Sequence, residues 1–442
     1  MKSFIKMAMI VLLSVLVLGP VFAGGGRQQE VRGRTLSFSM MAQPDPTAQQ
    51  LTREYYMEPI RRAFPNDTIN FIEWTDRQVL QIQVAGGGGP NIIHLDGPTD
   101  AVEFARAGRV IELDAYATRH GWKDVFFDWA YNSGLFNNRL YSIPDSFEGM
   151  LLFVNRDVFS RHNIAVPTNI EQLEAACRQF QSLGVIPISF GNSDYQGAVD
   201  WLYSTWITGY AGPPLNRQAI LGQERWNHPN IADGLQQMVN FWQNGWIGDR
   251  RSQAITMDDA ANLFATGRAA MMVNGTWLVG DLLLLYPDCN WETVLMPELR
   301  PGVGHHFPLA TGGAYTINAN TPDKDFAAEV LNWMFTDLDW HIRAVREANF
   351  QPFPVRAIAA RPDTFRGLDN RLERMYEILF ESMRTLNTGY CSWTFYPSDV
   401  RVFMNDNTDA LFLGRMSVAD YLARVQALTD VHVQRGTLPA VP

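Results

Sequence analysis

The sequence predicts an α/β fold with two lobes, each built on a mostly parallel sheet flanked by helices. Two observations support this prediction. Short apolar runs with the length of buried strands alternate along the chain with amphipathic helical segments, and such alternation is typical of parallel sheets. A mature chain of about 420 residues is also long enough for two α/β lobes that each bury a core of their own.

Residues 35–140 alternate strands and helices. The predicted strands are 35–40, 69–74 and 92–95, and the predicted helical segments are 43–63, 77–84 and 101–107. Four glycines precede Pro90, which raises the possibility of a phosphate-binding loop. We reject it, because a strand rather than a helix follows the glycines and no Lys-Ser or Lys-Thr pair is present.

Residues 141–442 continue in the same style. The predicted strands are 149–154, 185–190 and 312–320, and the predicted helices are 170–183, 233–244, 325–335 and 416–429. The proline-rich segment 287–310 lies between them and is expected to connect the lobes. Aromatic loops follow the strand at 185–190 and occupy 387–397.

The stretch 256–286 carries the clearest local signals in the sequence, and they predict a helix followed by a strand and a second helix. Thr256 and Asp259 have the spacing of a capping box at a helix N-terminus. Gly267 is a suitable residue for the end of that helix, because the position after a helix often has a positive φ. The apolar run 269–273 then has the length of a buried strand.

Trp277 follows this strand and is the main candidate for a ligand-facing ring. Asn274-Gly275 is a dipeptide typical of turns, and Thr276 can cap a helix that begins at Trp277. In open α/β sheets, ligands bind beyond the carboxyl ends of the strands. We therefore expect Trp277 to face a ligand, although a core position is the alternative.

Residues 1–23 have the order of a secretory signal peptide. Lys2 and Lys6 form a basic start, residues 7–18 form an apolar run too short for a membrane span, and small residues precede a cleavage point after Ala23. Residues 24–34 are rich in Gly and Gln and are expected to be a disordered tether. The protein is therefore expected to be exported.

Charge and composition exclude several kinds of partner. The formal charge of −10 becomes −12 when the segment with Lys2 and Lys6 is removed, which argues against nucleic acid and anionic membranes as partners. His305-His306 has no carboxylate or cysteine companion, so we expect no metal and no cofactor. The widely spaced cysteines allow one disulfide or three buried thiols; they are Cys177, Cys289 and Cys391.

Several segments resemble, in the same order, motifs of one family. The matching segments are FATGRAAMMVNGTW (264–277), YSIPDSFEGMLLFVNRDVF (141–159), PTNIEQLEAACRQF (167–180), GGPNIIHLD (88–96) and TGGAYTINANTPDKDFAAEVLNWMFTD (311–337). They resemble the extracellular sugar-binding proteins of bacterial ABC transporters, the maltose-binding-protein-like members of extracellular solute-binding protein family 1. The chain departs from the family pattern at Val154, at Asn169-Ile170 and at Asn91.

The resemblance implies a type II periplasmic binding protein fold. By analogy, lobe 1 would comprise 35–145 plus 306–357, and lobe 2 would comprise 146–305 plus 358–442, with crossings near 110–145, 300–310 and 350–360. The family implies a periplasmic monomer that delivers its ligand to the permease subunits of an ABC transporter.

Candidate binding residues lie at strand ends or in the loops that follow, where aromatic faces and polar groups could hold a sugar. They are Trp277, Glu148, Trp393, Asp96, Gly312, Gly313, Asp194, Asn192, Gln43 and Trp201. Each has a structural alternative: Glu148 could be a solvated loop acid, Asp96 a helix cap, and Trp201 a core residue. The glycine pair could simply form a tight turn.

The sequence therefore predicts a non-catalytic carbohydrate-binding protein. The rival hypotheses are a binding protein for a non-sugar solute, such as a polyamine or a peptide, and an exported glycosidase with paired carboxylates. The sequence contains neither G-x-S-x-G nor H-E-x-x-H.

Overall fold

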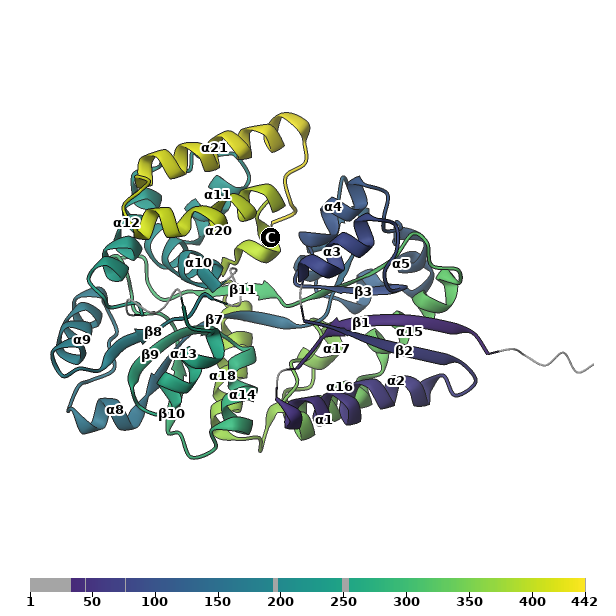
Figure 1. Cartoon of the computed structure of the whole chain (residues 1–442), viewed down its shortest axis with the longest axis horizontal. Helices are drawn as coiled ribbons and strands as arrows, with labels where there is room; N and C mark the ends of the chain where they lie inside the picture. Colours follow the sequence, from purple (N-terminus) through teal and green to yellow (C-terminus); the bar gives the residue numbers. More distant parts are fainter. Residues whose placement is uncertain (1–32, 44, 76, 194–197, 249–253, 442) are drawn as a thin grey trace, which may run out of the picture. The chain divides into compact units, whose positions relative to one another are not determined.

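The computed structural model describes residues 33–441 except 44, 76, 194–197 and 249–253 (Figure 1). The predicted signal peptide and nearly all of the predicted tether lie outside the described residues. Residues from Arg34 onward form one compact unit, as judged by the contacts within it.

The first sheet has the strand order β2-β1-β3-β12-β6. Its strands are β1 (Thr35–Met41), β2 (Thr68–Trp74), β3 (Ile92–Leu95), β6 (Ile143–Pro144) and β12 (Ala314–Ile317). The first three strands run parallel, whereas β12 runs antiparallel to both of its neighbours. The helices of this part are α1 (Pro46–Thr52), the π-helix η1 (Arg53–Met57), α2 (Glu58–Ala63), α3 (Arg77–Ala85), α4 (Asp100–Arg106), α5 (Asp114–His120), α6 (Trp122–Val125), α7 (Asp128–Ser133), α15 (Lys324–Thr336), α16 (Leu338–Ala348), α17 (Arg356–Ala359) and the 3-10 helix η2 (Pro362–Phe365).

The second sheet has the order β13-β11-β7-β9-β8, and β10 also pairs with β7. Its strands are β7 (Phe147–Asn155), β8 (Ile186–Ser189), β9 (Ala269–Gly275), β10 (Trp291–Val294), β11 (Phe307–Thr311) and β13 (Thr388–Tyr390). A separate hairpin joins β4 (Leu135–Phe136) to β5 (Arg139–Leu140).

Helices cover the second sheet along most of its length, and α20 and α21 lie side by side near the C-terminus (Figure 1). They are α8 (Arg156–Arg161), α9 (Ile170–Ser182), α10 (Ala198–Ala211), α11 (Pro213–Ile220), α12 (Pro229–Gln243), α13 (Met257–Ala265), α14 (Trp277–Leu285), α18 (Asn370–Arg384), α19 (Ser392–Phe395), α20 (Ser398–Phe412) and α21 (Val418–Arg435).

Two short segments carry the chain directly between the sheets. One lies between β6 and β7, and the other is Gly312-Gly313 between β11 and β12. They run next to each other, because the amide of Asp145 donates to the Gly313 carbonyl and the amide of Gly312 donates to the Ser146 carbonyl. These crossings bring residues that are far apart in sequence to one place.

The α/β prediction is confirmed. The expected parallel arrangement holds for β1, β2 and β3, whereas the second sheet is mostly antiparallel. Strand β7 runs antiparallel to β9, β10 and β11, and β12 runs antiparallel to β3 and β6. The physical reason lies in the crossings. A strand that enters a sheet straight from the other sheet, without a helical return, can run in the opposite direction to its neighbours.

The local predictions around Trp277 are confirmed in part. Thr256 and Asp259 form the capping box, and α14 begins at Trp277. Asn274-Gly275 forms no turn, because both residues pair with β7 as the last residues of β9. Thr276 makes no side-chain cap; its hydroxyl hydrogen-bonds the Gln351 side chain at 3.1 Å.

All three cysteines are buried free thiols. Within the described part of the chain, none of the helices combines the length and the apolar character that a membrane span requires.

Candidate functional site

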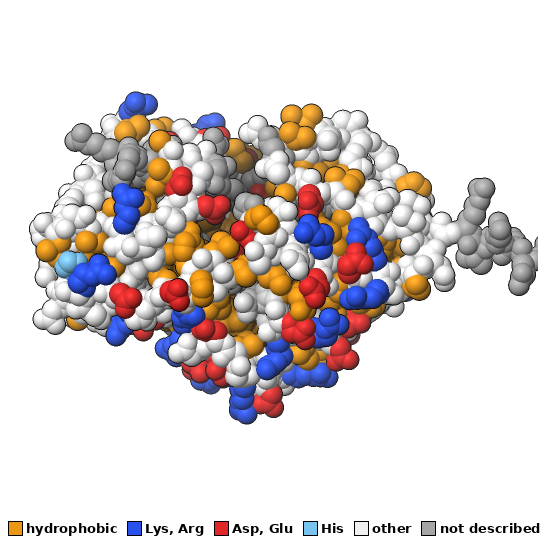
Figure 2. All heavy atoms as spheres, turned by 60° about the horizontal axis from the view of Figure 1, so that its bottom comes forward, with side chains coloured by type: hydrophobic (Ala, Val, Ile, Leu, Met, Phe, Trp, Pro, Cys, Tyr) orange, Lys and Arg blue, Asp and Glu red, His pale blue; other side chains and the backbone are white. Residues whose placement is uncertain are grey.

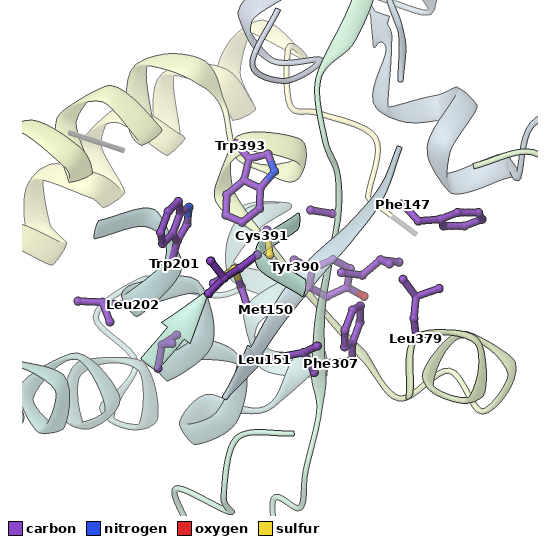
Figure 3. Close-up of a cluster of buried hydrophobic side chains, with 14 of the residues drawn as sticks. Phe147, Met150, Leu151, Trp201, Leu202, Phe307, Leu379, Tyr390, Cys391 and Trp393 are labelled. Atoms are coloured by element: carbon purple, nitrogen blue, oxygen red, sulfur yellow. The ribbon is translucent and has the colours of Figure 1, made fainter. Parts of the chain in front are cut away.

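Three tryptophan rings meet where β9 ends and α14 begins. The ring of Trp277 lies 5.1 Å from that of Trp201 on α10 and 6.3 Å from that of Trp393 on α19, measured between centroids. Trp201 is 8% exposed and Trp393 is 4% exposed, whereas Trp277 is only partly buried. Figure 3 shows the rings of Trp201 and Trp393 beside the buried cluster that contains Met150 and Cys391. Trp277 is therefore the ring of the three most open to a ligand.

The end of β9 fixes where the Trp277 ring lies. A side chain at Gly275 would overlap this ring, so the ring covers the face of the sheet to which residue 275 points. Gly275 pairs with Met150 on β7, and paired residues share a face. Side chains alternate along a strand, so Glu148 points to the same face as Met150. The register thus places the Glu148 carboxyl and the Trp277 ring on one face.

Two carboxyl groups lie beside the crossing segments. The Ser146 hydroxyl donates to Asp145 at 2.8 Å and lies 3.4 Å from a carboxyl oxygen of Glu148. His94, the third residue of β3, contacts the other Asp145 oxygen through Nε2 at 2.6 Å. Side chains at Gly312 and Gly313 would overlap these polar groups, so the glycines leave space for them. Glu148, Asp145 and Ser146 together are called the site carboxyl group below.

The pKa of Glu148 is raised well above its usual value. Burial is the largest cause, and the negative charges of Asp145 and Asp96 add to it. The hydrogen bond from Ser146 acts in the opposite direction, because it stabilises the ionised carboxylate. The site therefore holds carboxyl groups that repel one another in a partly desolvated place.

A cavity of about 270 Å³ opens beside these groups, between the first sheet and α14. Its lining combines aromatic rings with polar side chains: Met40, Met41, Gln43, Ala48, Leu51, Thr52, Tyr56, His94, Asp145, Ser146, Trp277, Gly280, Asp281, Leu284, Tyr315, Ala348, Asn349, Phe350, Gln351 and Phe353. Figure 2 shows a hollowed face on which hydrophobic side chains and Asp or Glu side chains lie close together.

An aromatic wall supports the polar side of the cavity. The hydroxyls of Tyr56 and Tyr315 hydrogen-bond each other. The Tyr315 ring lies 5.0 Å from the His94 ring and 6.2 Å from the Phe353 ring. Burial raises the pKa of Tyr315, with further contributions from Tyr56 and Asp145. Both phenols therefore remain neutral hydrogen-bonding groups at ordinary pH.

The chain matches the family model described as bacterial extracellular solute-binding protein over residues 48–337. The chain belongs to this family. The resemblance seen in the sequence motifs is thereby confirmed. A binding protein of Brucella abortus is 21% identical over 313 residues, which is 67% of this chain and 72% of that protein. A glucose-binding protein of Saccharolobus solfataricus is 26% identical over 198 residues, covering 40% of this chain and 34% of that protein.

Solved structures of solute-binding proteins share the two-lobed fold. A chitin oligosaccharide binding protein superposes with a TM-score of 0.75 at 18% identity, covering 91% of this chain and 99% of that one. A maltose-bound protein of T. maritima superposes with a TM-score of 0.68 at 18% identity, covering 90% of this chain and 100% of the other. The family member described here therefore has the fold of these proteins.

The structure brings several predicted site residues together. Trp277 lies beside both Trp201 and Trp393, Gln43 lines the cavity, and Glu148 lies beside the glycine pair. A side chain at Gly97 would overlap the Trp393 backbone, so the loop after β3 also approaches this place.

The remaining predicted residues are less closely connected to the cavity. Asp96 contributes to the charge at Glu148. The suggestion that it caps the next helix is wrong, because Thr99 is the N-cap residue of α4. Asn192 follows β8 and is not among the cavity-lining residues. Asp194 lies outside the described residues.

The sequence analysis missed Asp145, Ser146 and His94 as site residues. Asp145 and Ser146 lie within the matched segment 141–159, so their position next to Glu148 was a usable signal. His94 gave no such signal, because only the crossing of distant segments brings it to Asp145.

Proposed function

We propose that the protein is the carbohydrate-binding component of a bacterial ABC importer. It captures a mono- or oligosaccharide between its lobes and delivers it to the permease subunits. Family membership and sugar-binding relatives support this proposal. The observation that carries it is the partly exposed Trp277 ring on the same face as the Glu148 carboxyl, beside an aromatic-lined cavity.

This combination suits the chemistry of a sugar. A pyranose has a face of C–H groups that stacks on an aromatic ring, and hydroxyls around its edge that require acceptors and donors. Trp277 offers the ring, and Asp145, Gln43 and His94 line the same cavity with polar groups. An analogue that lacks a hydroxyl would leave a buried polar group unpaired, at a cost of about 1–3 kcal/mol, so such groups discriminate among sugars.

Hinge closure forms part of the proposal. In this proposal lobe 1 comprises 35–145 plus 306–357 and lobe 2 comprises 146–305 plus 358–442, except that β11 (Phe307–Thr311) pairs with β7 and β13 and therefore belongs to lobe 2. The segments that connect the sheets include 145–146 and 312–313, which are short and lie side by side, as expected for a hinge that bends without sliding. Small-angle scattering should show a smaller radius of gyration when ligand is saturating.

Export forms the other part. A signal peptide cleaved after Ala23 would deliver a monomer to the periplasm, and N-terminal sequencing of the exported protein should begin at Gly24. Mature protein that retains Met1 would contradict this part of the proposal.

A panel of sugars tests the function directly. A ligand that binds only the folded state raises stability by RT ln(1 + [L]/Kd), or about 2.7 kcal/mol at a hundredfold excess over Kd. At least one mono- or oligosaccharide should raise the melting temperature in proportion to the logarithm of its concentration. A shift with putrescine or a peptide mixture and with no sugar would instead identify a binding protein for a non-sugar solute.

The neighbouring carboxyl groups of Asp145 and Glu148 are also an observation in favour of the glycosidase hypothesis. A carboxyl with a raised pKa next to a second carboxyl group is the arrangement that glycosidases use for acid catalysis. Family membership favours binding over turnover. Incubation of the ligand with the protein should leave the ligand intact by mass spectrometry, and hydrolysis products that disappear in Glu148→Gln would establish the enzyme instead.

A further inference from the structure

The cavity is acidic. Asp145 and Asp281 belong to its lining, and Glu148 lies immediately behind Ser146. Among the described lining residues there is no Lys and no Arg. His94, bound to Asp145, is the basic side chain of the lining. Acidic side chains therefore outnumber basic ones in this part of the site.

The carboxyl groups of Asp145 and Glu148 lie near each other around one serine hydroxyl. One serine hydroxyl lies within reach of both Asp145 and Glu148, at 2.8 and 3.4 Å. A side chain at Gly312 would overlap the Ser146 hydroxyl and the Glu148 carboxyl, and one at Gly313 would overlap His94 and lie close to Asp145. The glycine pair thus preserves a close approach of like charges, which is costly without a compensating cation.

Elsewhere the protein provides that cation itself. Asp200, 1% exposed on its side chain, contacts Arg401 Nε at 2.9 Å, and Asp100 lies 3.6 Å from the same guanidinium. These two buried carboxylates are therefore paired with an arginine. The site carboxyl group differs, because its described contacts are a serine hydroxyl and a histidine ring.

We propose that the ligand itself carries the missing charge and is an amino sugar with a free ammonium group. This inference rests on the proposed function and specifies its ligand class. The ammonium group has three N–H donors and can contact Asp145 and Glu148 together in charge-assisted hydrogen bonds. The sugar ring that bears it stacks on Trp277, and the N-acetylated and hydroxyl analogues lack the charge.

A bare metal ion fits the site less well. No group of three or more His, Cys, Asp or Glu side chains in the described part of the chain has metal-binding geometry. The aromatic lining from Trp277, Tyr315 and Phe353 suits an organic ring rather than a hydrated ion. A flexible diamine would use the carboxylates but leave the stacking face of Trp277 without a flat partner.

The raised pKa of Glu148 adds a measurable consequence. Groups that face this carboxyl are Asp145 and Ser146 on the crossing segment, Asp96 after β3 and the thiol of Cys391 before α19, with His94 reaching it through Asp145. A bound ammonium favours the ionised carboxyl, so it lowers this pKa and releases a proton. Affinity for an amino sugar should therefore increase as the pH rises through the pKa of Glu148 in the free protein.

Three matched sets of sugars test the proposal by titration calorimetry at low salt. Glucosamine, glucose and N-acetylglucosamine differ only at position 2, and the galactose set and the β-1,4-linked oligomers of the glucose set repeat the comparison. The best amino sugar should bind about tenfold or more tightly than its two matched analogues, a difference of about 1.4 kcal/mol. Repeating the titration in buffers with different ionisation enthalpies should reveal proton release.

The variant Glu148→Gln keeps the shape and removes the charge. The ratio of the affinities for the amino sugar and its neutral analogue, measured on the same variant, should fall from about tenfold to near one. A circular dichroism melt of the variant verifies that it is folded.

Each other outcome overturns the inference. Equal or tighter binding of a neutral or N-acetylated sugar would refute the ammonium requirement and leave the carbohydrate-binding function standing. A response to calcium or putrescine that exceeds every sugar response would refute both. Absence of binding by every amino sugar in the sets would also overturn the inference, and the neutral sugars in the same sets then decide the proposed function separately.

Discussion

Two groups of carboxylates in this molecule are buried or partly buried, and they differ in their counter-ions. In the first, which we call the Arg401 cluster, Asp100 and Asp200 flank the guanidinium of Arg401. In the second, the site carboxyl group, Asp145 and Glu148 share a serine hydroxyl and repel each other. The first group has its cation built in. The second bears an electrostatic cost in the free protein.

Asp200 of the Arg401 cluster has several hydrogen-bond donors besides the guanidinium. Asp200 also accepts hydrogen bonds from Tyr203, from Ser392 at 2.5 Å and from Asn405 at 3.1 Å. These donors satisfy the hydrogen-bonding capacity of a buried carboxylate. The comparison teaches that buried charge alone does not mark a binding site, whereas buried charge without full compensation does.

Removal of the built-in cation should have the largest effect. Arg401→Met leaves Asp200 and Asp100 buried without their positive partner, and the free energy of unfolding should fall by about 3–5 kcal/mol. Urea denaturation measures the change. Arg384→Met is the matched control, because Arg384 pairs with Glu381 on the exposed surface and should matter little. Equal losses in the two variants would show that the Arg401 cluster contributes no special stability.

Truncation of the exposed ring should instead act on binding. Trp277→Ala removes the stacking face, so ligand affinity should fall by roughly 2 kcal/mol, about thirtyfold, as measured by calorimetry. Trp242→Ala is the matched control, because Trp242 is also partly buried but stacks on Phe412 away from the cavity. If Trp277 were a core residue, its removal would cost about 3–5 kcal/mol of stability and leave the affinity unchanged.

The pH dependence of stability should separate the two groups further. Glu148 has a higher pKa in the folded protein than its usual value of 4.5, so the folded state holds this proton more tightly than the unfolded state. The stabilising contribution of Glu148 is thus greatest at low pH, and it is lost as the pH rises from about 4.5 through the folded-state pKa. Melts of wild type and Glu148→Gln across this range should diverge, and parallel curves would contradict the raised pKa.

The smallest expected effect concerns the shared hydroxyl. Ser146→Ala removes the donor that favours the ionised form of Glu148, so the pKa of Glu148 should rise further. Stability at neutral pH should fall by about 1 kcal/mol. Ser182→Ala is the control, since the Ser182 hydroxyl bonds a carbonyl within its own exposed helix end. NMR titration of the Glu148 side chain measures the pKa, and an unchanged value would show that Ser146 does not act on it.

Local sequence signals predicted what local interactions determine. The capping box of Thr256 and Asp259 forms as expected, with hydrogen bonds of 3.0 and 3.1 Å, because it involves residues only three apart. Asn274-Gly275 shows the limit of such signals. The dipeptide is typical of turns, but pairing of Gly275 with Met150 on β7 holds it in the strand.

The candidate site depends on contacts that no short motif encodes. His94 reaches Asp145 across 51 positions of sequence, and Gly312 lies against Glu148 only because the two crossing segments run side by side. The ring at Trp277 could be proposed from its place after a strand. Trp201 could be proposed in the same way, but its contact with Trp277 and the wall of Tyr56 and Tyr315 required the folded structure.

The thermal stability of Glu148→Gln should be measured at neutral pH with and without the best sugar ligand. The free variant should melt at a higher temperature than wild type, because the repulsion with Asp145 is gone. Saturating ligand should raise the melting temperature of the variant less than that of wild type. A free variant less stable than wild type, with an undiminished gain from ligand, would contradict the claim that these carboxylates are kept at a cost to stability for binding.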